Sequence, residues 1–318
     1  MKPKVLLTHQ LFPEAIELIK KEAEIEFCSS DHSPSKKEII QKIKDKQGLL
    51  CLLVDTIDQE VIAAGQQLKV IANCAVGYNN IDVEYAHSRG IYVTNTPGVL
   101  TETTADLTWA LLLAVARRVP EADRFTRAGR FTGWRLDLFL GQEVTGKQLG
   151  IIGLGRIGRA VAERAQGFKM KVVYTDPRPL PEEEERKLGV KRVSLDDLLK
   201  YSDFVTIHTA LTPQTYHLIS AREFALMKKE AILINVARGP VVDEKALVEA
   251  LEKKQIWGAG LDVYEREPLI EEKLLRLDNV VLLPHIGSAS RETRLKMALT
   301  AAKNLIQGIQ GKKPDNLV

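Results

Sequence analysis

The sequence predicts an α/β protein built from two doubly wound parallel-sheet domains. Short β-type runs alternate with helical patterns along the chain, an order typical of parallel sheets with helices on both faces. The chain has 318 residues, enough for two domains with separate cores. A Gly-x-Gly-x-x-Gly pattern at residues 153–158 lies between a β-type run and a helical pattern. We expect it in only one of the two domains.

The first hundred residues contain the first series of alternating elements. Apolar residues between 12 and 19 recur at the spacing of one helix face. Ser35, followed three residues later by Glu38, predicts a capping box at a helix start. The β-type runs lie at residues 4–7, 25–27, 48–54, 69–72 and 91–93. This block has no glycine fingerprint of its own, so we expect it to be the substrate domain.

Val76 and Gly77 follow the fourth of these runs and form a candidate anion site. The glycine frees backbone amides that could hold a carboxylate. The alternative is an ordinary strand-to-helix turn, which is the better explanation on the local residues alone. The motif therefore gains weight only from its context.

The chain between the two domains contains a long helix and an unusual connecting segment. Thr101 and Glu102 predict the start of a helix that runs through Arg118. Residues 120–147 are polar and carry aromatic side chains, among them Trp134. Exposed aromatic residues of this kind often mark a contact surface. We expect a homodimer arm here, and a small satellite core cluster is the alternative.

The glycine pattern predicts a dinucleotide site. Gly153 allows the tight turn, Gly155 lets the backbone approach a pyrophosphate, and Gly158 lets the helix pack against the strand. Free N–H groups at the helix start face the phosphates. A second β-type run, 171–174, is closed by Asp176, which lies 18 residues past Gly158 (176 − 158). That offset suits a carboxylate that binds a ribose 2′-hydroxyl.

Further polar residues follow the β-type runs of the C-terminal half. Thr209, Arg238, Asp262 and His285 each come at or just after the end of such a run, and Glu267 lies in the loop after Asp262. In a parallel sheet these ends share one edge, where ligands bind. Each residue has an ordinary alternative as an ion pair, a cap, a surface charge or a hydrogen-bonded histidine. Their placement together at one sheet edge favours a ligand-binding site. Pro213 lies in the turn after Thr209, whereas His208 lies too early in its run to be favoured for catalysis.

Composition excludes several classes of function. The formal net charge is +3, too small to suggest a nucleic-acid surface. The three cysteines show no metal or disulfide spacing, which suits a reducing compartment. The acidic residues 182–185 are expected to form a solvated helix face rather than a metal site. The apolar runs are too short to span a bilayer, so we expect a cytoplasmic protein without metal, membrane or nucleic-acid partners.

Taken in order, these motifs resemble the D-isomer-specific 2-hydroxyacid dehydrogenase family over essentially the whole chain. The residues that carry the resemblance are the glycine pattern with Asp176 and the segments 235–239, 262–268 and 283–288. Residues 76–77, 96–101 and 137–141 look most like the glyoxylate/hydroxypyruvate reductase branch.

The resemblance implies a role for each candidate residue. Arg238 would hold the carboxylate and keto oxygen of the substrate, His285 would be the general acid, Glu267 would orient and charge His285, and Asp262 would meet the nicotinamide end. Val76 and Gly77 would bind the other side of the carboxylate. The implied cofactor contacts are Thr104, Gly153, Gly155, Arg156, Ile157, Gly158, Asp176, Thr209, Pro213, Val236, Ala237, Arg238, Asp262, His285 and Gly287.

The resemblance also implies the activity and the layout. We expect reduction of a small 2-oxo acid, glyoxylate or hydroxypyruvate, by hydride transfer from NAD(P)H. Residues 1–100 and 288–318 would form a flavodoxin-like substrate domain, and 101–287 a Rossmann NAD-binding domain, with a cleft that closes during catalysis. The charge of Asp176 should repel a 2′-phosphate and favour NAD over NADP, although the nearby Arg178 softens this preference.

Two kinds of alternative stay open. One is a related dehydrogenase for D-lactate, formate, phosphite or phosphoglycerate. An extra basic residue near Val76 would favour the phosphorus-containing substrates, whereas the loop offers mostly backbone and apolar contacts. The other is a non-catalytic NAD(H)-sensing module, which would need partner-binding surfaces that the sequence does not reveal.

Overall fold

The computed structural model describes residues 2–29 and 33–318, which divide into two compact units. Unit 1 comprises Met1–Leu100 and Ala289–Val318, and unit 2 comprises Thr101–Ser288. Each unit contains one parallel β-sheet with helices on both faces. The predicted fold class, two parallel-sheet α/β domains, is therefore confirmed.

Unit 1 is built on a five-stranded parallel sheet of order β2-β1-β3-β4-β5, the flavodoxin-like arrangement. Strands β1, β3 and β4 are almost completely buried, as expected where helices cover both faces. The strand bounds are β1 Lys4–Leu7, β2 Glu24–Phe27, β3 Gly48–Cys51, β4 Val70–Asn73 and β5 Tyr92–Thr94.

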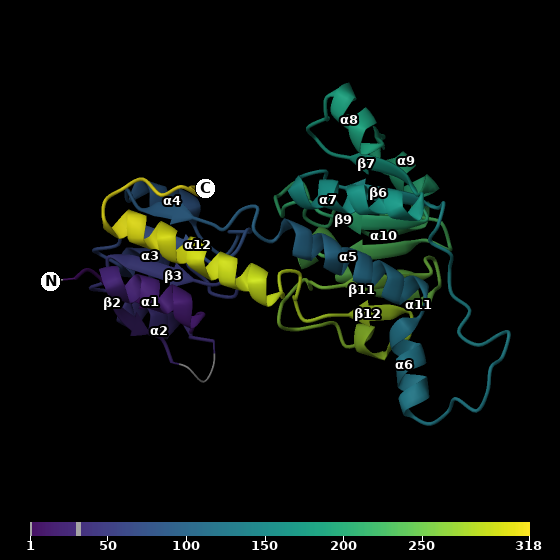
Figure 1. Cartoon of the computed structure of the whole chain (residues 1–318), viewed down its shortest axis with the longest axis horizontal. Coiled ribbons are helices and arrows are strands. Elements are labelled where there is room, and N and C mark those ends of the chain that lie inside the picture. The colour runs from purple at the N-terminus through teal and green to yellow at the C-terminus, as the bar shows by residue number, and fades with distance from the viewer. Residues whose placement is uncertain (1, 30–32) are drawn as a thin grey trace. The chain divides into compact units, whose positions relative to one another are not determined.

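Helices from both ends of the chain cover the sheet of unit 1. Helices α1 (Pro13–Glu22) and α12 (Arg291–Ile309) lie side by side and share an apolar core with one face (Figure 1). The other face packs against α2, α3 and α4. Their bounds are α2 Lys36–Lys42, α3 Gln59–Ala64 and α4 Val83–Ser88.

The capping box predicted at Ser35 is only half formed. The Ser35 hydroxyl accepts a hydrogen bond from the Glu38 N–H at 3.2 Å. The Glu38 carboxylate instead accepts from the Ser29 N–H at 2.6 Å. It thus holds the chain after β2 rather than the helix start.

Unit 2 is built on a seven-stranded parallel sheet of order β12-β11-β10-β9-β6-β7-β8. Reading outward from β6, the chain runs first through β7 and β8 and then returns to β9, so the strand order reverses between β6 and β9. Such a switch point is where open α/β sheets bind ligands. The strand bounds are β6 Gln148–Ile152, β7 Lys171–Thr175, β8 Val190–Arg192, β9 Phe204–Ile207, β10 Ile232–Asn235, β11 Gly258–Leu261 and β12 Val280–Leu282.

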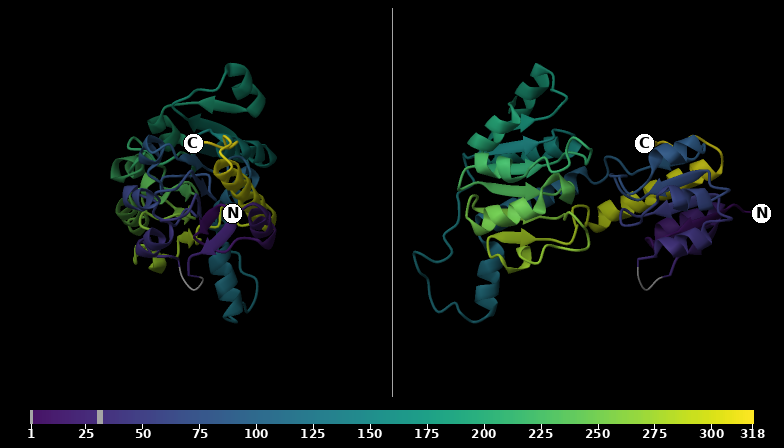
Figure 2. Two further views of the ribbon diagram at one scale, coloured as in Figure 1. Left: turned by 90° about the vertical axis from the view of Figure 1, so that its left-hand side faces the viewer. Right: turned by 180° about the vertical axis from the view of Figure 1, so that it is seen from behind.

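Two groups of helices cover the faces of this sheet. Helices α5 (Thr101–Ala116) and α7 (Arg156–Ala165) pack on one face. Helices α9, α10 and α11 pack on the other, which faces the viewer in the right-hand view of Figure 2. Apart from α6 (Val119–Arg127), which follows α5, the other helices of unit 2 are α8 Glu182–Leu188, α9 Leu195–Tyr201, α10 Ala221–Leu226, α11 Glu244–Glu252 and the short 3-10 turns Gln166–Phe168, Gly239–Val241 and Leu274–Arg276. No helix in the part of the chain that the structure describes is long and apolar enough to cross a membrane.

The segment after α5 begins as a helix and then continues as a long loop that projects from the rest of unit 2 (Figure 1). Helix α6 (Val119–Arg127) was not predicted from the sequence. In the loop, Phe139 packs edge-on against Phe125 at 5.2 Å between ring centroids. Trp134 and Leu136 are each 80% exposed. Phe139 therefore packs in a small satellite cluster, whereas Trp134 and Leu136 do not.

A glycine in α7 makes the close contact expected between helix and strand. A Cβ added at Gly158 would lie 2.3 Å from the Gly153 carbonyl oxygen. We therefore expect Gly158→Ala to destabilise the protein by about 1–3 kcal/mol, seen as a lowered Tm in thermal unfolding. Gly167→Ala is the matched control, because a Cβ there meets nothing within 4 Å. Equal Tm values for the two variants would contradict the contact.

Candidate active site and nucleotide site

The polar residues singled out in the C-terminal half all follow strands of the seven-stranded sheet. Since these strands are parallel, their carboxyl ends lie at one edge of unit 2, on either side of the switch point. The residues delivered there are Gly153 after β6, Asp176 after β7, Thr209 and Pro213 after β9, Val236, Ala237 and Arg238 after β10, Asp262 after β11 and His285 after β12.

The glycine turn has the shape that a pyrophosphate requires. Gly153 has φ +91°, and a Cβ there would lie 2.8 Å from the backbone of His208 and Thr209. Gly155 is the N-cap of α7 and is exposed, and a Cβ there would meet nothing within 4 Å. The backbone of the helix start is thus open to a ligand. Arg156, exposed, and Ile157, partly buried, begin the helix beside it.

Asp176 is held in place by backbone amides. Its Oδ2 accepts from the Leu154 N–H and its Oδ1 from the Arg178 N–H, both at 2.8 Å. The guanidinium of Arg192 donates to the Asp176 carbonyl oxygen at 2.9 Å. The sequence analysis missed Arg192 because strand β8, which carries it, was not predicted.

His285 and Glu267 form a hydrogen-bonded pair. The His285 Nδ1 lies 2.8 Å from Glu267 Oε2, and the side chains are 25% and 27% exposed. Glu267 Oε1 accepts from the Tyr264 N–H at 3.0 Å. Burial raises the pKa of the Glu267 carboxyl, but the bond and charge of His285, the Tyr264 N–H and the charge of Arg238 outweigh it, so this pKa lies below its ordinary value. Glu267 is therefore ionised at neutral pH.

The backbone at His285 is in the left-handed region, with φ +52°, which is uncommon for a residue with a side chain. Asp262 fixes this turn: its two carboxylate oxygens accept from the Ile286 and Gly287 N–H groups at 2.7 and 2.8 Å. Burial raises the pKa of Asp262 despite these bonds. Thr104 of α5 donates to the Gly287 carbonyl at 3.1 Å. Asp262, Thr104 and Gly287 thus hold the loop that carries His285, a role that the sequence did not predict.

Arg238 is positioned by a compact turn after β10. The buried Asn235 side chain accepts from the Ala237 N–H and donates to the Arg238 carbonyl, each at 3.1 Å. The Arg238 guanidinium donates to the Ala237 carbonyl at 2.7 Å. Burial lowers the pKa of Arg238, and the charge of Glu267 partly offsets this.

Gly239 brings the loops after β10 and β11 into direct backbone contact. A Cβ at Gly239 would lie only 1.8 Å from the Tyr264 carbonyl oxygen. The loop that carries Arg238 and the loop that carries Glu267 therefore touch at a position that only glycine can occupy.

A neighbouring acidic residue, Glu265, belongs to a different group of contacts. Its Oε1 lies 3.2 Å from Nε2 of His217, and its Oε2 accepts from the Glu244 N–H at 3.2 Å. Asp243 Oδ2 lies 3.9 Å from the other ring nitrogen of His217. Although it is only two residues from Glu267, Glu265 serves to join α11 to the loop before α10.

His208 has the structural role that the sequence favoured. Its Nε2 lies 2.8 Å from the Thr206 hydroxyl. Burial lowers its pKa to about 3, so the ring is neutral at physiological pH. At that pH, His208 therefore does not act as a general acid.

Val76 and Gly77 lie in unit 1, in the loop after β4, at the carboxyl edge of the five-stranded sheet. Their carbonyl oxygens accept from the side-chain amides of Asn95 and Asn73, each at 2.8 Å. The sequence analysis did not single out either asparagine.

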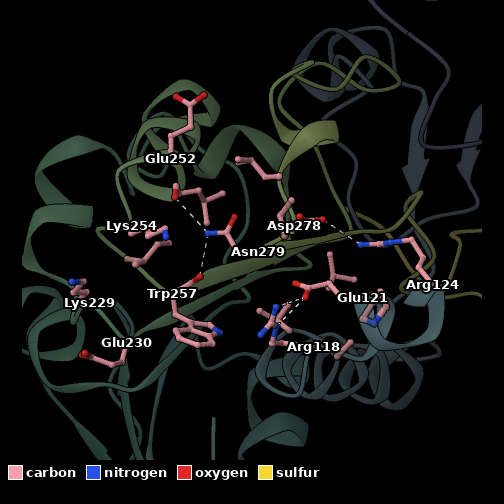
Figure 3. Close-up of a pocket in the computed structure, with 18 residues that line it drawn as sticks. Arg118, Glu121, Arg124, Lys229, Glu230, Glu252, Lys254, Trp257, Asp278 and Asn279 are labelled. Carbon is pink, nitrogen blue, oxygen red and sulfur yellow. Dashed lines mark hydrogen bonds and ion pairs between the residues drawn. The ribbon is translucent and has the colours of Figure 1, made fainter. Parts of the chain in front are cut away.

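A pocket of about 600 Å³ lies at the opposite edge of the seven-stranded sheet (Figure 3). Lys229, Trp257 and Asn279, which line it, come just before strands β10, β11 and β12. Its charged groups are mixed in sign, and Arg118 is paired with Glu121. The residues of the candidate active site are therefore not part of this pocket.

The chain as a whole is similar to known proteins. Residues 109–287 match the family model of the D-isomer specific 2-hydroxyacid dehydrogenase, NAD binding domain. A glyoxylate reductase of Thermococcus litoralis is 51% identical, over 100% of this chain and 97% of that protein. A glyoxylate reductase of Korarchaeum cryptofilum is also 51% identical, over 100% and 96%.

Solved structures show the same likeness. A glyoxylate reductase from Paecilomyes thermophila has 33% identity and a TM-score of 0.89, over 100% of this chain and 98% of that one. An NADPH-dependent glyoxylate/hydroxypyruvate reductase from Sinorhizobium meliloti, solved with NADP and malonate, has 32% identity and a TM-score of 0.89, over 100% and 97%. This chain therefore belongs to the D-isomer specific 2-hydroxyacid dehydrogenase family.

Proposed function

We propose that this protein reduces a small 2-oxo acid, glyoxylate or hydroxypyruvate, with NAD(P)H. The observation that carries the proposal is the pair of His285 with the ionised Glu267 at the same sheet edge as Arg238 and the glycine turn. An acid, its carboxylate partner and a guanidinium are the groups that carbonyl reduction of an anionic substrate needs. The likeness to glyoxylate reductases at about half identity supports the substrate class.

The glycine turn, Asp176 and the strand ends beyond the switch point would hold the dinucleotide. When bound, the nicotinamide supplies a hydride to the keto carbon. Negative charge then builds on the keto oxygen, where the His285 imidazolium stabilises it and donates a proton from Nε2. Glu267 keeps Nδ1 of the ring in place.

Arg238 has a separate task in the proposal. A planar guanidinium binds a carboxylate through two parallel hydrogen bonds, which fixes the keto carbon for reaction. The turn closed by Asn235 presents this side chain. In the proposal, Asp262 and Thr104 act on the substrate only through the loop of His285.

We further propose that residues 101–287 form the NAD-binding domain, and residues 1–100 with 288–318 the substrate domain. The matched family model lies within the former range. The cytoplasmic location and the homodimer expected from the sequence remain proposals. The exposed Trp134 and Leu136 of the loop after α6 support a contact surface for a second copy.

We also propose NAD as the preferred cofactor, because the carboxylate of Asp176 would repel a 2′-phosphate. Asp176→Ser should raise the ratio of kcat/KM with NADPH to that with NADH by about tenfold, because the variant no longer places a negative charge against the 2′-phosphate. Steady-state rates with both cofactors measure the ratio. Asp203→Ser, a change at the amino edge of β9, is the control, and an unchanged ratio in Asp176→Ser would show that Asp176 does not set the cofactor preference.

The proposed function is tested by the loss of reduced-nicotinamide absorbance with the purified protein. NADH and NADPH are offered in turn against glyoxylate, hydroxypyruvate and pyruvate. Fast oxidation with the first two acids is the expected result. Tight NADH binding without turnover on any of them would contradict the proposal.

A further inference from the structure

Three consecutive carbonyl groups in the loop after β4 are tied into the interior of unit 1. The Ala75 carbonyl accepts from the Thr96 N–H at 2.9 Å. The Val76 carbonyl accepts from Nδ2 of Asn95, and the Gly77 carbonyl from Nδ2 of Asn73, each at 2.8 Å. Asn73 is completely buried and Asn95 is 8% exposed. Each of these peptide units is therefore held from the protein side.

The N–H of a trans peptide points away from its own carbonyl, and the peptide bonds of this loop are trans. With the Val76 and Gly77 carbonyls directed inward, the N–H groups of Gly77 and Tyr78 are directed away from the asparagines. The loop becomes exposed along this stretch, with Tyr78 43% exposed. Across the described residues, no hydrogen bond within unit 1 uses either N–H group.

We propose that Asn73 and Asn95 are positioning residues, which direct the Gly77 and Tyr78 N–H groups at the two oxygens of the substrate carboxylate. The inference rests on the proposed function and deepens it by naming a donor, Tyr78 N–H, and the side chains that set its direction. Successive N–H groups that point to one side form an anion-binding concavity.

A second layer of contacts fixes the orientation of the Asn73 amide. Its Nδ2 also donates to Asn80 Oδ1 at 3.2 Å, and its Oδ1 accepts from the Cys51 thiol at 3.7 Å. Burial raises the pKa of Cys51, so the thiol keeps its proton and remains a donor. The oxygen of Asn73 must then face Cys51 and its nitrogen must face Gly77.

Asn80 ties this loop to the neighbouring one. Its Nδ2 donates to the carbonyls of Leu52 and Asp55, both at 3.0 Å. The loops after β3 and β4 are thus joined through Asn80 and Asn73.

The chemistry of the loop selects the ligand class. Residues 74–80 contain no basic side chain, so this loop itself offers only neutral N–H donors. Two such donors suit the two oxygens of a singly charged carboxylate, the group that a 2-oxo acid carries.

Selective isotope labelling can observe the two amides directly. Val-Gly and Gly-Tyr each occur once in the sequence, at 76–77 and 77–78. Protein with ¹³C-carbonyl valine and ¹⁵N-glycine, or ¹³C-carbonyl glycine and ¹⁵N-tyrosine, therefore gives a single carbonyl-correlated amide signal in each sample. Oxamate, an unreactive 2-oxo acid analogue, is titrated into the full-length protein with NADH present. Both signals should shift and saturate together.

Variants connect this signal to the asparagines. Asn95→Ala should weaken the oxamate-induced shift and raise the KM for glyoxylate on the order of tenfold, with kcat and the KM for NADH changing far less. Asn95→Leu, which keeps the side-chain volume, should do the same. Asn279→Ala is the matched control, because its amide also donates to a backbone carbonyl, that of Trp257, but in unit 2.

The outcomes separate this inference from the proposed function. If oxamate inhibits the protein but leaves both amide signals unmoved, or if both Asn95 variants keep the wild-type KM, the inference is overturned. If no 2-oxo acid is reduced, the proposed function fails. A saturable shift of both amides by oxamate would support the carboxylate site even then.

Discussion

His285→Ala should lower kcat for glyoxylate reduction on the order of 10²- to 10⁴-fold, the usual contribution of a positioned general acid. The loss follows because the variant lacks Nε2 of the ring, the atom proposed to donate the proton. Cofactor affinity should stay nearly unchanged, which NADH fluorescence titration measures.

Two further measurements make this result specific. His87→Ala, a substitution of an exposed histidine on α4, should leave kcat unaltered. Retention of full activity in His285→Ala would show that the proton comes from another group. A loss of activity accompanied by a lowered Tm would point to damage of the turn at His285, so both variants are compared by thermal unfolding.

Glu267→Gln should lower kcat/KM on the order of 10²-fold, because a neutral amide neither holds nor favours the charged imidazolium. In the wild type the pKa of Glu267 lies below the ordinary 4.5. A lowered carboxyl pKa means that the stabilising pair persists above that pKa and is lost as the pH falls through it. The wild-type pH–rate profile should therefore have an acid limb below the ordinary pKa of Glu267, and the variant, which has no carboxylate at this position, should lack that limb.

Glu265→Gln provides the control for this prediction. It makes the same change two residues earlier in the same loop, where the carboxylate contacts His217 and Glu244 instead of His285. We expect its pH–rate profile to match that of the wild type. Identical profiles for the two variants would mean that Glu267 acts only as a structural part of its loop.

The sequence predicted which polar residues share one sheet edge better than it predicted the contacts around them. Parallel strands must share an edge, so polar residues after successive apolar runs could be placed together without coordinates. The left-handed turn at His285 and its support by Asp262 could not be foreseen, because they depend on backbone contacts between loops. Arg192 was missed because its strand spans only three residues, too few for periodicity to show.

Within unit 1, the sequence singled out Val76 and Gly77 but not the side chains that orient them. Asn73 is the last residue of β4 and Asn95 directly follows β5, and asparagine at such positions is ordinary turn chemistry. Their common target emerges only when two neighbouring strands are paired. A sequence pattern along one segment carries no sign of that pairing.

The contact between Gly239 and the Tyr264 carbonyl has a consequence for altering this protein. Because the backbones touch there, the loops of Arg238 and Glu267 behave as one mechanical part, and a shift of either would displace the other. Insertions or deletions in one loop would therefore disturb substrate binding and proton delivery together. Substrate range is therefore more readily changed by replacing side chains than by altering the length of either loop.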